Sequence, residues 1–366
     1  MAEDELPPKP EGPLRSGWTT GACAAAAARA AGEALATGRM PARVTIRLPK
    51  GQMPEFAVVG PASGPGWAEA GIVKDAGDDP DVTHGAQIRT RLEPAPAGSG
   101  VSFVAGEGVG TITRPGLPLG VGEPAINPGP RGMIAAALAD VHARFGGPVD
   151  WRVTVSIPGG AALAAKTLNF RLGIVGGLSV LGTTGIVTPY SCAAWIHSIH
   201  RGIDVARATG LGHVAAATGS TSEAFVQKLY GLPDHALIDM GDFAGGTLKY
   251  LREKPVARVT LAGGFAKLAK LAAGAMDLHS ARSRVDNSHL AGLLAGLGAP
   301  DDLVARAGGD ASAGAILADA RRAGIPIGDA VARGALAVAA SIAGGGVALD
   351  VIVVDRAGEL VGRAGP

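Results

Sequence analysis

The chain has 366 residues and a formal net charge of +1, from 33 Lys and Arg against 32 Asp and Glu. This balance and an aromatic content of 4% argue against a polyanion-binding surface, so we expect no nucleic-acid partner. A chain of this length suffices for two domains with separate cores, and a hydrophobic content of 47% favours a globular enzyme over a disordered chain. Cys23 and Cys192 are far apart and form no CxxC pair, which favours a reducing cytoplasm and argues against a disulfide framework or a protein-bound metal.

The beginning of the chain lacks the composition of an export signal. Residues 1–11 are acidic, and the run after Gly21 is mostly alanine, which is less hydrophobic than the core of a signal peptide. The longest run without Asp, Glu, Lys or Arg covers residues 172–200, and glycines, a proline and hydroxyl residues interrupt it. We therefore expect a soluble protein with a disordered leader over residues 1–13 and no membrane partner.

Residues 14–170 predict an α+β domain. Residues 19–38 predict a helix, because Thr19 or Thr20 can cap its start and Gly38 stands where a C-terminal glycine belongs. Apolar runs bounded by Gly and Pro predict strands with antiparallel pairing, and a second helix follows a proline-rich loop. The strand segments are 43–48, 55–60, 86–94, 100–113 and 151–158, and the second helix is 130–146.

Residues 171–366 predict an α/β domain with a Rossmann-like fold and a mostly parallel sheet. Strand-like runs at 213–219, 235–241 and 257–264 each precede a helical segment, which is typical of parallel βαβ units. Residues 286–345 predict consecutive helices, and residues 346–355 predict a closing strand. The last third of the chain therefore adds a helical part to this domain.

Two glycine-containing loops are candidate ligand sites. Gly219, Ser220 and Thr221 follow a predicted strand and open a helix, where free backbone N–H groups favour a carboxylate or a phosphate. The segment 176–191 offers backbone that a ligand can approach closely and two hydroxyl groups, from Gly176, Gly177, Gly182, Thr183, Thr184 and Gly185. Ordinary helix capping in the first loop and a tight apolar crossover in the second explain the same residues without a ligand.

Titratable side chains gather in two other segments. Residues 73–85 contain Asp75 and Asp78 among further acidic residues, and such carboxylates can accept protons, although Asp is also common in turns. The second segment, 267–283, contains His279 near the end of a helix. A serine hydrolase is disfavoured there because the chain has no GxSxG motif.

A proline-rich segment at 113–134 carries Arg114, Asn127 and Arg131. A stiff loop with two arginines can clamp carboxylates, since a guanidinium group binds a carboxylate through two hydrogen bonds. A rigid connection between elements explains the same composition.

Six motifs in order carry a resemblance to the CbiD family, the cobalt-precorrin-5B C(1)-methyltransferases of cobalamin biosynthesis. The motifs span residues 14 to 280, so the resemblance covers most of the chain. They are LRSGWTTGACAAAAARAA, KDAGDDPDVTHGAQI, TRPGLPLGVGEPAINPGPRGMI, GGLSVLGTTGIVTPYS, ATGSTSE and KLAKLAAGAMDLHS. Two positions depart from the family pattern: Ala266 replaces a glycine, and Leu278 replaces a threonine.

The resemblance implies methylation of ring carbon 1 of cobalt-precorrin-5B by S-adenosylmethionine, giving cobalt-precorrin-6A, on a fold unlike that of the usual tetrapyrrole methylases. Cobalt would then enter only as part of the corrin substrate. We expect the donor over Gly176–Gly185 and Gly219–Thr221, and the macrocycle between the two halves. Its carboxylates would be held by Arg15, Arg114 and Arg131, with Asn127, Thr19 and Thr20 as further substrate contacts.

The residues leave the proton acceptor open among Asp75, Asp78 and His279. They also leave open a different class of protein, a carrier that binds corrin intermediates without catalysis, because both usual methyltransferase glycine signatures are absent. A nucleotide-dependent transferase or kinase is disfavoured, since the chain has no phosphate-loop lysine. A homo-oligomer and transient contacts with neighbouring pathway enzymes are both compatible with the sequence.

Overall fold

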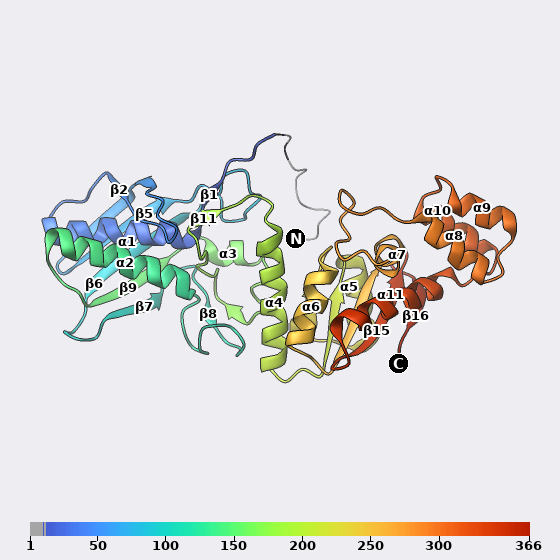
Figure 1. Ribbon diagram of the computed structural model, residues 1–366. Coiled ribbons are helices and arrows are strands. Elements are labelled where there is room, and N and C mark those ends of the chain that lie inside the picture. The colour runs from blue at the N-terminus through green and yellow to red at the C-terminus, as the bar shows by residue number, and fades with distance from the viewer. Residues whose placement is uncertain (1–9, 11) are drawn as a thin grey trace. The chain divides into compact units, whose positions relative to one another are not determined.

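The computed structural model describes residue 10 and residues 12–366, so the predicted leader lies outside the described residues except for residues 10, 12 and 13. The chain forms two compact units, unit 1 ending at Ser191 and unit 2 comprising Cys192–Pro366 (Figure 1). The division falls after Ser191 rather than after residue 170, because two short strands of the intervening segment pair within unit 1. β10 (Ile174–Val175) pairs with β8 (Thr111–Ile112), and β11 (Ile186–Val187) pairs with β1 (Gly17–Trp18).

Unit 1 contains a five-stranded sheet. Its order is β4 (Val59–Gly64), β5 (Trp67–Val73), β6 (Gln87–Pro94), β9 (Trp151–Ser156) and β7 (Val101–Ala105). All neighbours are antiparallel except β7 and β9, which are parallel, so the expected antiparallel pairing holds for most of the sheet. A separate antiparallel pair joins β2 (Arg43–Thr45) to β3 (Glu55–Ala57).

Helix α1 (Thr20–Thr37) is the buried centre of unit 1 and packs between α2 (Pro128–Phe145) and the strands β5 and β6. It begins and ends where the sequence predicts: Thr19 caps its start and Gly38 closes it in a left-handed conformation, with a φ of 73°. Its residues from Ala22 to Ala28 are fully buried. Because alanine side chains are short, the two helices approach closely, and a Cβ on Gly21 would lie 2.6 Å from Cγ of Pro130. A short helix, α3 (Gly160–Ala164), completes the unit.

Unit 2 contains a second five-stranded sheet, ordered β13 (Leu237–Asp239), β12 (His213–Ala217), β14 (Arg258–Gly264), β15 (Ala348–Val354) and β16 (Leu360–Ala364). The first four strands are parallel, as expected, and β16 is antiparallel to β15. The next strand in the chain, β13, pairs on one side of β12, whereas β14 pairs on the other side. The direction of growth therefore reverses between β12 and β14.

Helices cover both faces of this sheet. One face packs against α4 (Cys192–Ala208), α6 (Ala244–Glu253), α7 (Phe265–Ala272) and α11 (Ile327–Ala343), and the other against α5 (Ser220–Tyr230). A 3-10 turn at Asp234–Ala236 precedes β13. The predicted helical part is present as α8 (Asn287–Gly296), α9 (Asp301–Gly308) and α10 (Ala313–Arg322).

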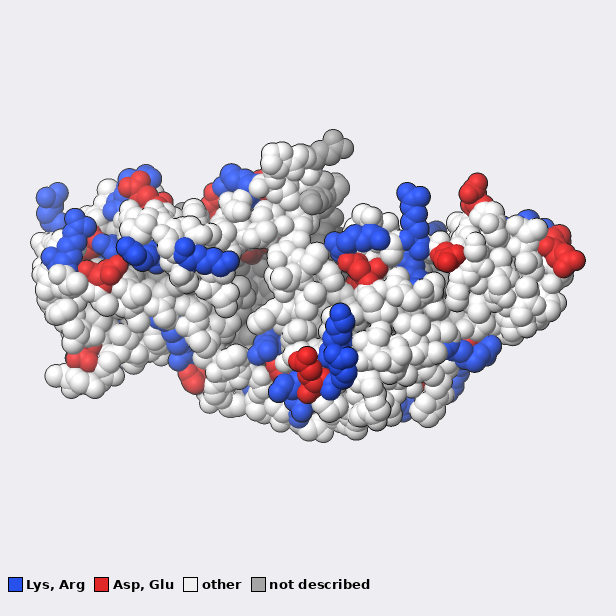
Figure 2. All heavy atoms as spheres, in the orientation of Figure 1, with Lys and Arg blue, Asp and Glu red and all other residues white. Residues whose placement is uncertain are grey.

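The surface is mixed in charge. On the face drawn in Figure 2, basic and acidic side chains are interspersed and separated by broad uncharged areas. In the part of the chain that the structure describes, no helix has both the length and the apolar character needed to span a membrane.

Candidate active site

Three of the sequence motifs meet at the start of α1 in unit 1. The backbone N–H of Trp18 donates to the carbonyl of Asp75 at 2.7 Å, and that of Thr19 donates to the carbonyl of Gly185 at 3.0 Å. The contact is tight, because a Cβ on Gly17 would lie 2.0 Å from the carbonyl carbon of Ala76. The segments 14–22, 73–85 and 176–191, distant in sequence, thus form one local structure.

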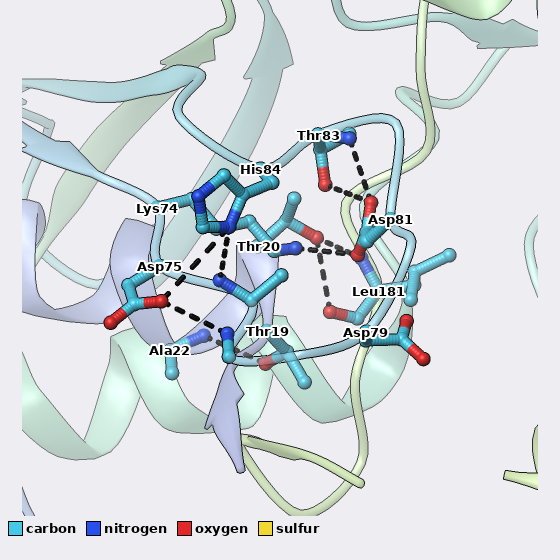
Figure 3. A network of polar contacts seen from close by, with 12 residues as sticks. Thr19, Thr20, Ala22, Lys74, Asp75, Asp79, Asp81, Thr83, His84 and Leu181 are labelled. Carbon is cyan, nitrogen blue, oxygen red and sulfur yellow. Dashed lines mark hydrogen bonds and ion pairs between the residues drawn. The ribbon is translucent and has the colours of Figure 1, made fainter. Parts of the chain in front are cut away.

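Thr19 and Thr20 use their hydroxyl groups within this structure (Figure 3). The hydroxyl of Thr19 accepts a hydrogen bond from the N–H of Ala22 at 3.2 Å. The hydroxyl of Thr20 donates to the carbonyl of Leu181 at 3.1 Å and accepts from its N–H at 3.0 Å. Both residues are buried, with 5% and 3% of their surface exposed. These contacts fasten the 176–191 loop to the helix.

The glycines of the 176–191 loop permit this docking. A Cβ on Gly182 would lie 2.3 Å from Cβ of Thr19, and one on Gly185 would lie 2.5 Å from Cδ2 of Leu48. A Cβ on Gly177 would lie 2.3 Å from the carbonyl oxygen of Gly108. A Cβ on Gly176, unlike one on the other three glycines, would meet no atom within 4 Å. The hydroxyl of Thr184 donates to the carbonyl of Ile186 within the loop.

Asp75 and Asp78 both bind Arg15. The Arg15 guanidinium contacts the two Asp75 carboxylate oxygens at 2.5 and 2.9 Å, and the backbone N–H of Arg15 donates to Asp78 at 2.6 Å. The Arg15 hydrogen bonds and a further one from the N–H of Gly77 lower the pKa of Asp75 to about 2. A carboxylate with so low a pKa accepts protons poorly near neutral pH.

A buried ion pair, whose residues were not among the predicted site residues, lies in the same loop. The Lys74 side chain is 1% exposed, and its Nζ lies 2.5 Å from Asp81. Burial favours the neutral acid, but Lys74 and the N–H and hydroxyl of Thr83 lower the pKa of Asp81. Burial also raises the pKa of Asp79, whose carboxylate accepts the N–H of Tyr190 at 2.9 Å. Figure 3 shows Asp75, Asp79 and Asp81 on the loop that faces the start of α1.

The two predicted clamp arginines hold backbone carbonyls of unit 1. Arg114 donates to the carbonyl of Phe170 at 2.8 Å. Arg131 donates to the carbonyl of Ile126 at 2.7 Å and pairs with Glu123 at 2.8 Å. Asn127 is the residue before α2, and its side chain makes no capping bond to that helix.

A pocket of about 360 Å³ lies along α2, from Pro128 to Asp140. Thr183 reaches it from the docked loop, and Arg47 and Asp140 supply charge, while Leu48, Pro128 and Met133 supply apolar surface. Of the predicted site residues, only Thr183 lines it.

The remaining predicted residues lie in unit 2, at the carboxyl edge of its sheet. Gly219 precedes α5, and Ser220 and Thr221 are its first residues. Cβ positions on Gly219 and on Gly264, the last residue of β14, meet nothing within 4 Å. Because α5 and α7 leave neighbouring strands toward opposite faces, this edge is the point where open parallel sheets bind ligands.

Further charged groups stand at this edge. Asp242, which follows β13, pairs with Lys267 in the first turn of α7, and the carbonyl of Asp242 accepts the N–H of Leu278 at 2.9 Å. Burial lowers the pKa of Lys270, whose Nζ donates to the carbonyl of Leu278 at 2.7 Å.

His279 lies next to these groups. Its backbone N–H donates to Asp277 at 3.0 Å, and its Nδ1 accepts the N–H of Ala281 at 3.1 Å. Asp242 was not among the predicted site residues, although an acidic residue directly after the predicted strand 235–241 could have marked it as a candidate.

Comparison with known proteins identifies the family. The CbiD profile matches residues 8–189, and the CbiD C-terminal domain profile matches residues 277–365. A cobalt-precorrin-5B C(1)-methyltransferase from Bradyrhizobium sp. is 62% identical over 96% of this chain and 94% of its own. The chain belongs to the CbiD family. A protein of the same name from Paramagnetospirillum magneticum is 58% identical over 96% of this chain and 98% of its own.

A solved structure is also similar to this CbiD family member. It is the 1.9 Å crystal structure of the cobalamin biosynthesis protein CbiD from Archaeoglobus fulgidus. The two chains are 26% identical, with a TM-score of 0.40, over 74% of this chain and 84% of that one.

Proposed function

We propose that this protein is a methyltransferase that transfers the methyl group of S-adenosylmethionine to carbon 1 of cobalt-precorrin-5B, giving cobalt-precorrin-6A. The observation that carries the proposal is similarity over nearly the whole chain to curated C(1)-methyltransferases, at 62% and 58% identity. The cobalt belongs to the substrate. Cys23 and Cys192 are both free thiols, which is compatible with a cytoplasmic location.

The donor site belongs, in this proposal, to the carboxyl edge of the unit 2 sheet, which we interpret as Rossmann-like. The reversal of strand order between β12 and β14 supports this placement, as do the open glycines at the two strand ends. The first turn of α5 offers N–H groups at Ser220 and Thr221 to the donor carboxylate. A Cβ on Gly182 or Gly185 would clash with Thr19 or Leu48, and a Cβ on Gly177 would clash with Gly108, so we assign these three glycines to loop docking instead.

The substrate site belongs to unit 1, around the start of α1. In the reaction a bond forms between carbon 1 and the methyl carbon while the sulfur–methyl bond breaks, and its electron pair stays on sulfur. The chain's own contribution is therefore alignment and exclusion of water rather than covalent chemistry. Arg15 is the arginine best placed to bind a substrate acetate or propionate, since its side chain is 58% exposed. Arg131, by comparison, is only 24% exposed and is bound to Glu123 and to the carbonyl of Ile126.

The macrocycle loses a proton as it gains the methyl group, and a base must accept that proton. Asp75 accepts a proton poorly near neutral pH while Arg15 holds its pKa near 2. Asp78 is exposed, and its contact with Arg15 is to a neutral backbone N–H. We therefore favour Asp78 over Asp75, with His279 as the alternative on unit 2. Asp75 then acts as a positioning residue for the Arg15 guanidinium.

Incubation with methyl-labelled S-adenosylmethionine and cobalt-precorrin-5B tests the reaction, with mass analysis of the corrin product. We expect one labelled methyl group in the product. Arg15→Ala should raise KM more than it lowers kcat. Arg131→Ala is the control with the same loss of charge, and it should mainly lower the stability of the fold. Binding of the corrin precursor without donor binding or methyl transfer would favour a non-catalytic carrier.

A further inference from the structure

Asp242 is a buried aspartate, and only one of its two carboxylate oxygens has a hydrogen-bond partner in the described structure. The residue is 1% exposed, and Lys267 of α7 binds its Oδ1. Its Oδ2 has no hydrogen-bond partner within the described structure. A buried charged oxygen without a partner is costly, so native proteins rarely keep one unless a ligand or water completes it.

Asp350, the other buried aspartate of unit 2, shows the contrast. Its two oxygens accept bonds from Thr260, Arg258 and Tyr230 at 2.8 to 3.1 Å. Asp350 is the third residue of β15, near the amino ends of the parallel strands. At Asp350, therefore, side chains of the protein itself donate hydrogen bonds to both carboxylate oxygens. Asp242 lies at the opposite edge, where the ligand site is proposed.

The surrounding backbone places Asp242 beside the end of β12. The N–H groups of Met240 and Gly241 both donate to the carbonyl of Ala217, the last residue of that strand, at 3.0 and 3.2 Å. Lys267 enters from α7, which follows β14 on the other side of β12. The ion pair therefore joins the two strand ends that flank Thr218 and Gly219.

The chemistry of this position selects a hydroxyl ligand. An ionised carboxylate only accepts hydrogen bonds, so its partner must donate, and a phosphate or carboxylate would be repelled. In dinucleotide-binding folds an acidic residue about 20 positions after the glycine loop binds a ribose hydroxyl. Asp242 follows Gly219 at a similar spacing and lies just after the neighbouring strand, β13.

We propose that Oδ2 of Asp242 accepts a hydrogen bond from a ribose hydroxyl of the adenosyl methyl donor. This inference rests on the proposed function, because it assigns the nucleoside part of the same donor. The Lys267 side chain is 31% exposed and the carboxylate 1%, so Lys267 is the partner that shifts when the ribose enters. Asp242 is thus a binding residue for the donor and takes no part in proton transfer.

Calorimetric titration of the full chain with S-adenosylhomocysteine and its 2′-deoxy and 3′-deoxy analogues tests the proposal. The wild type should bind one deoxy analogue about 10- to 100-fold more weakly, the loss expected for one hydrogen bond to a charged group. In Asp242→Ala this discrimination should disappear, so that all three ligands bind within about twofold. Asp242→Asn should reduce the discrimination while keeping the shape of the side chain.

Lys267→Gln is the matched control, since it alters the same ion pair but leaves the carboxylate in place. It should retain the preference for the ribose hydroxyl. Equal binding of all three ligands by the wild type, or unchanged discrimination in Asp242→Ala, would overturn the assignment. Failure of the wild type to bind S-adenosylhomocysteine at all would instead count against the donor in the proposed function.

Discussion

At the scale of single residues, the structure assigns partners to groups that the sequence presents only as reactive types. Thr20 has a hydroxyl that a ligand could use, yet it holds Leu181 from both its N–H and its carbonyl. Asp75 has a carboxylate that could accept a proton, yet Arg15 binds both of its oxygens. In each case the partner is remote in sequence, and local patterns carry no record of it.

Cys23 provides a test at this scale. Burial raises the pKa of its thiol to about 12, despite the nearby Lys74. Because the thiolate is the reactive form, Cys23 should not react with a disulfide reagent at pH 8 in the folded protein. Cys192 is only half-buried and should react. Thiol titration should thus count one group before unfolding and two after it, and rapid labelling of Cys23 would refute the buried position.

The Arg15–Asp75 pair predicts a pH dependence of stability. The folded-state pKa of Asp75 is about 2, below the ~3.9 of an aspartate in an unfolded chain. A lowered pKa contributes stability that is complete above about pH 4 and is lost as the pH falls toward 2. The unfolding midpoint of Asp75→Asn should therefore lie slightly below that of the wild type at pH 6, by a small amount because the pair is exposed. A gap that stays constant down to pH 2 would contradict this interpretation.

At the scale of elements, the buried helix α1 organises unit 1. Strong local signals made it predictable: a capping threonine, a closing glycine and a run of good helix formers. Strand β5, which packs against α1, was missed because Ala68, Ala70 and Gly71 are poor strand formers. Their small size is what the close approach of α1 requires, so packing overrides propensity at this strand.

The docking of the 176–191 loop on α1 can be tested with two glycines. Gly182 has a φ of 118° and no room for a Cβ, whereas Gly176 has a φ of 88° and open space. Gly176→Ala should cost about 1–3 kcal/mol of unfolding free energy for backbone strain alone. Gly182→Ala should cost about 1–3 kcal/mol more, because the helix cap and loop must separate. Denaturant titration measures both, and equal losses would show that the tight contact with Thr19 is unimportant.

At the scale of the whole molecule, the proposed function divides its two ligands between the units. The motifs of the first half gather at the start of α1, and those of the second half gather at the carboxyl edge of the unit 2 sheet. From the sequence we expected the glycines of 176–185 and of 219–221 to bind the same methyl donor. We propose different tasks for them, because Gly182 and Gly185 face neighbouring side chains, whereas a Cβ on Gly219 would meet nothing within 4 Å.

Hydrogen exchange measured by mass spectrometry checks this division in the intact protein. Adding S-adenosylhomocysteine should slow exchange in 218–222, 240–243 and 263–268, where the donor would cover backbone N–H groups. Exchange in 176–187 should change little. Adding the corrin precursor should instead protect 14–22 and 73–85. Protection of 176–187 by the donor alone would return those glycines to the donor site.

The sequence by itself determined the family, the helix limits of α1 and the alternation of strands and helices in unit 2. These features follow from motifs, caps and periodicity, which are local along the chain. Only the tertiary structure decided that residues 171–191 belong with unit 1, that Arg15 lowers the pKa of Asp75, and that Asp242 keeps an unpartnered oxygen. The physical reason is distance: Arg15 and Asp75 are 60 positions apart, and burial and charge act through space rather than along the chain.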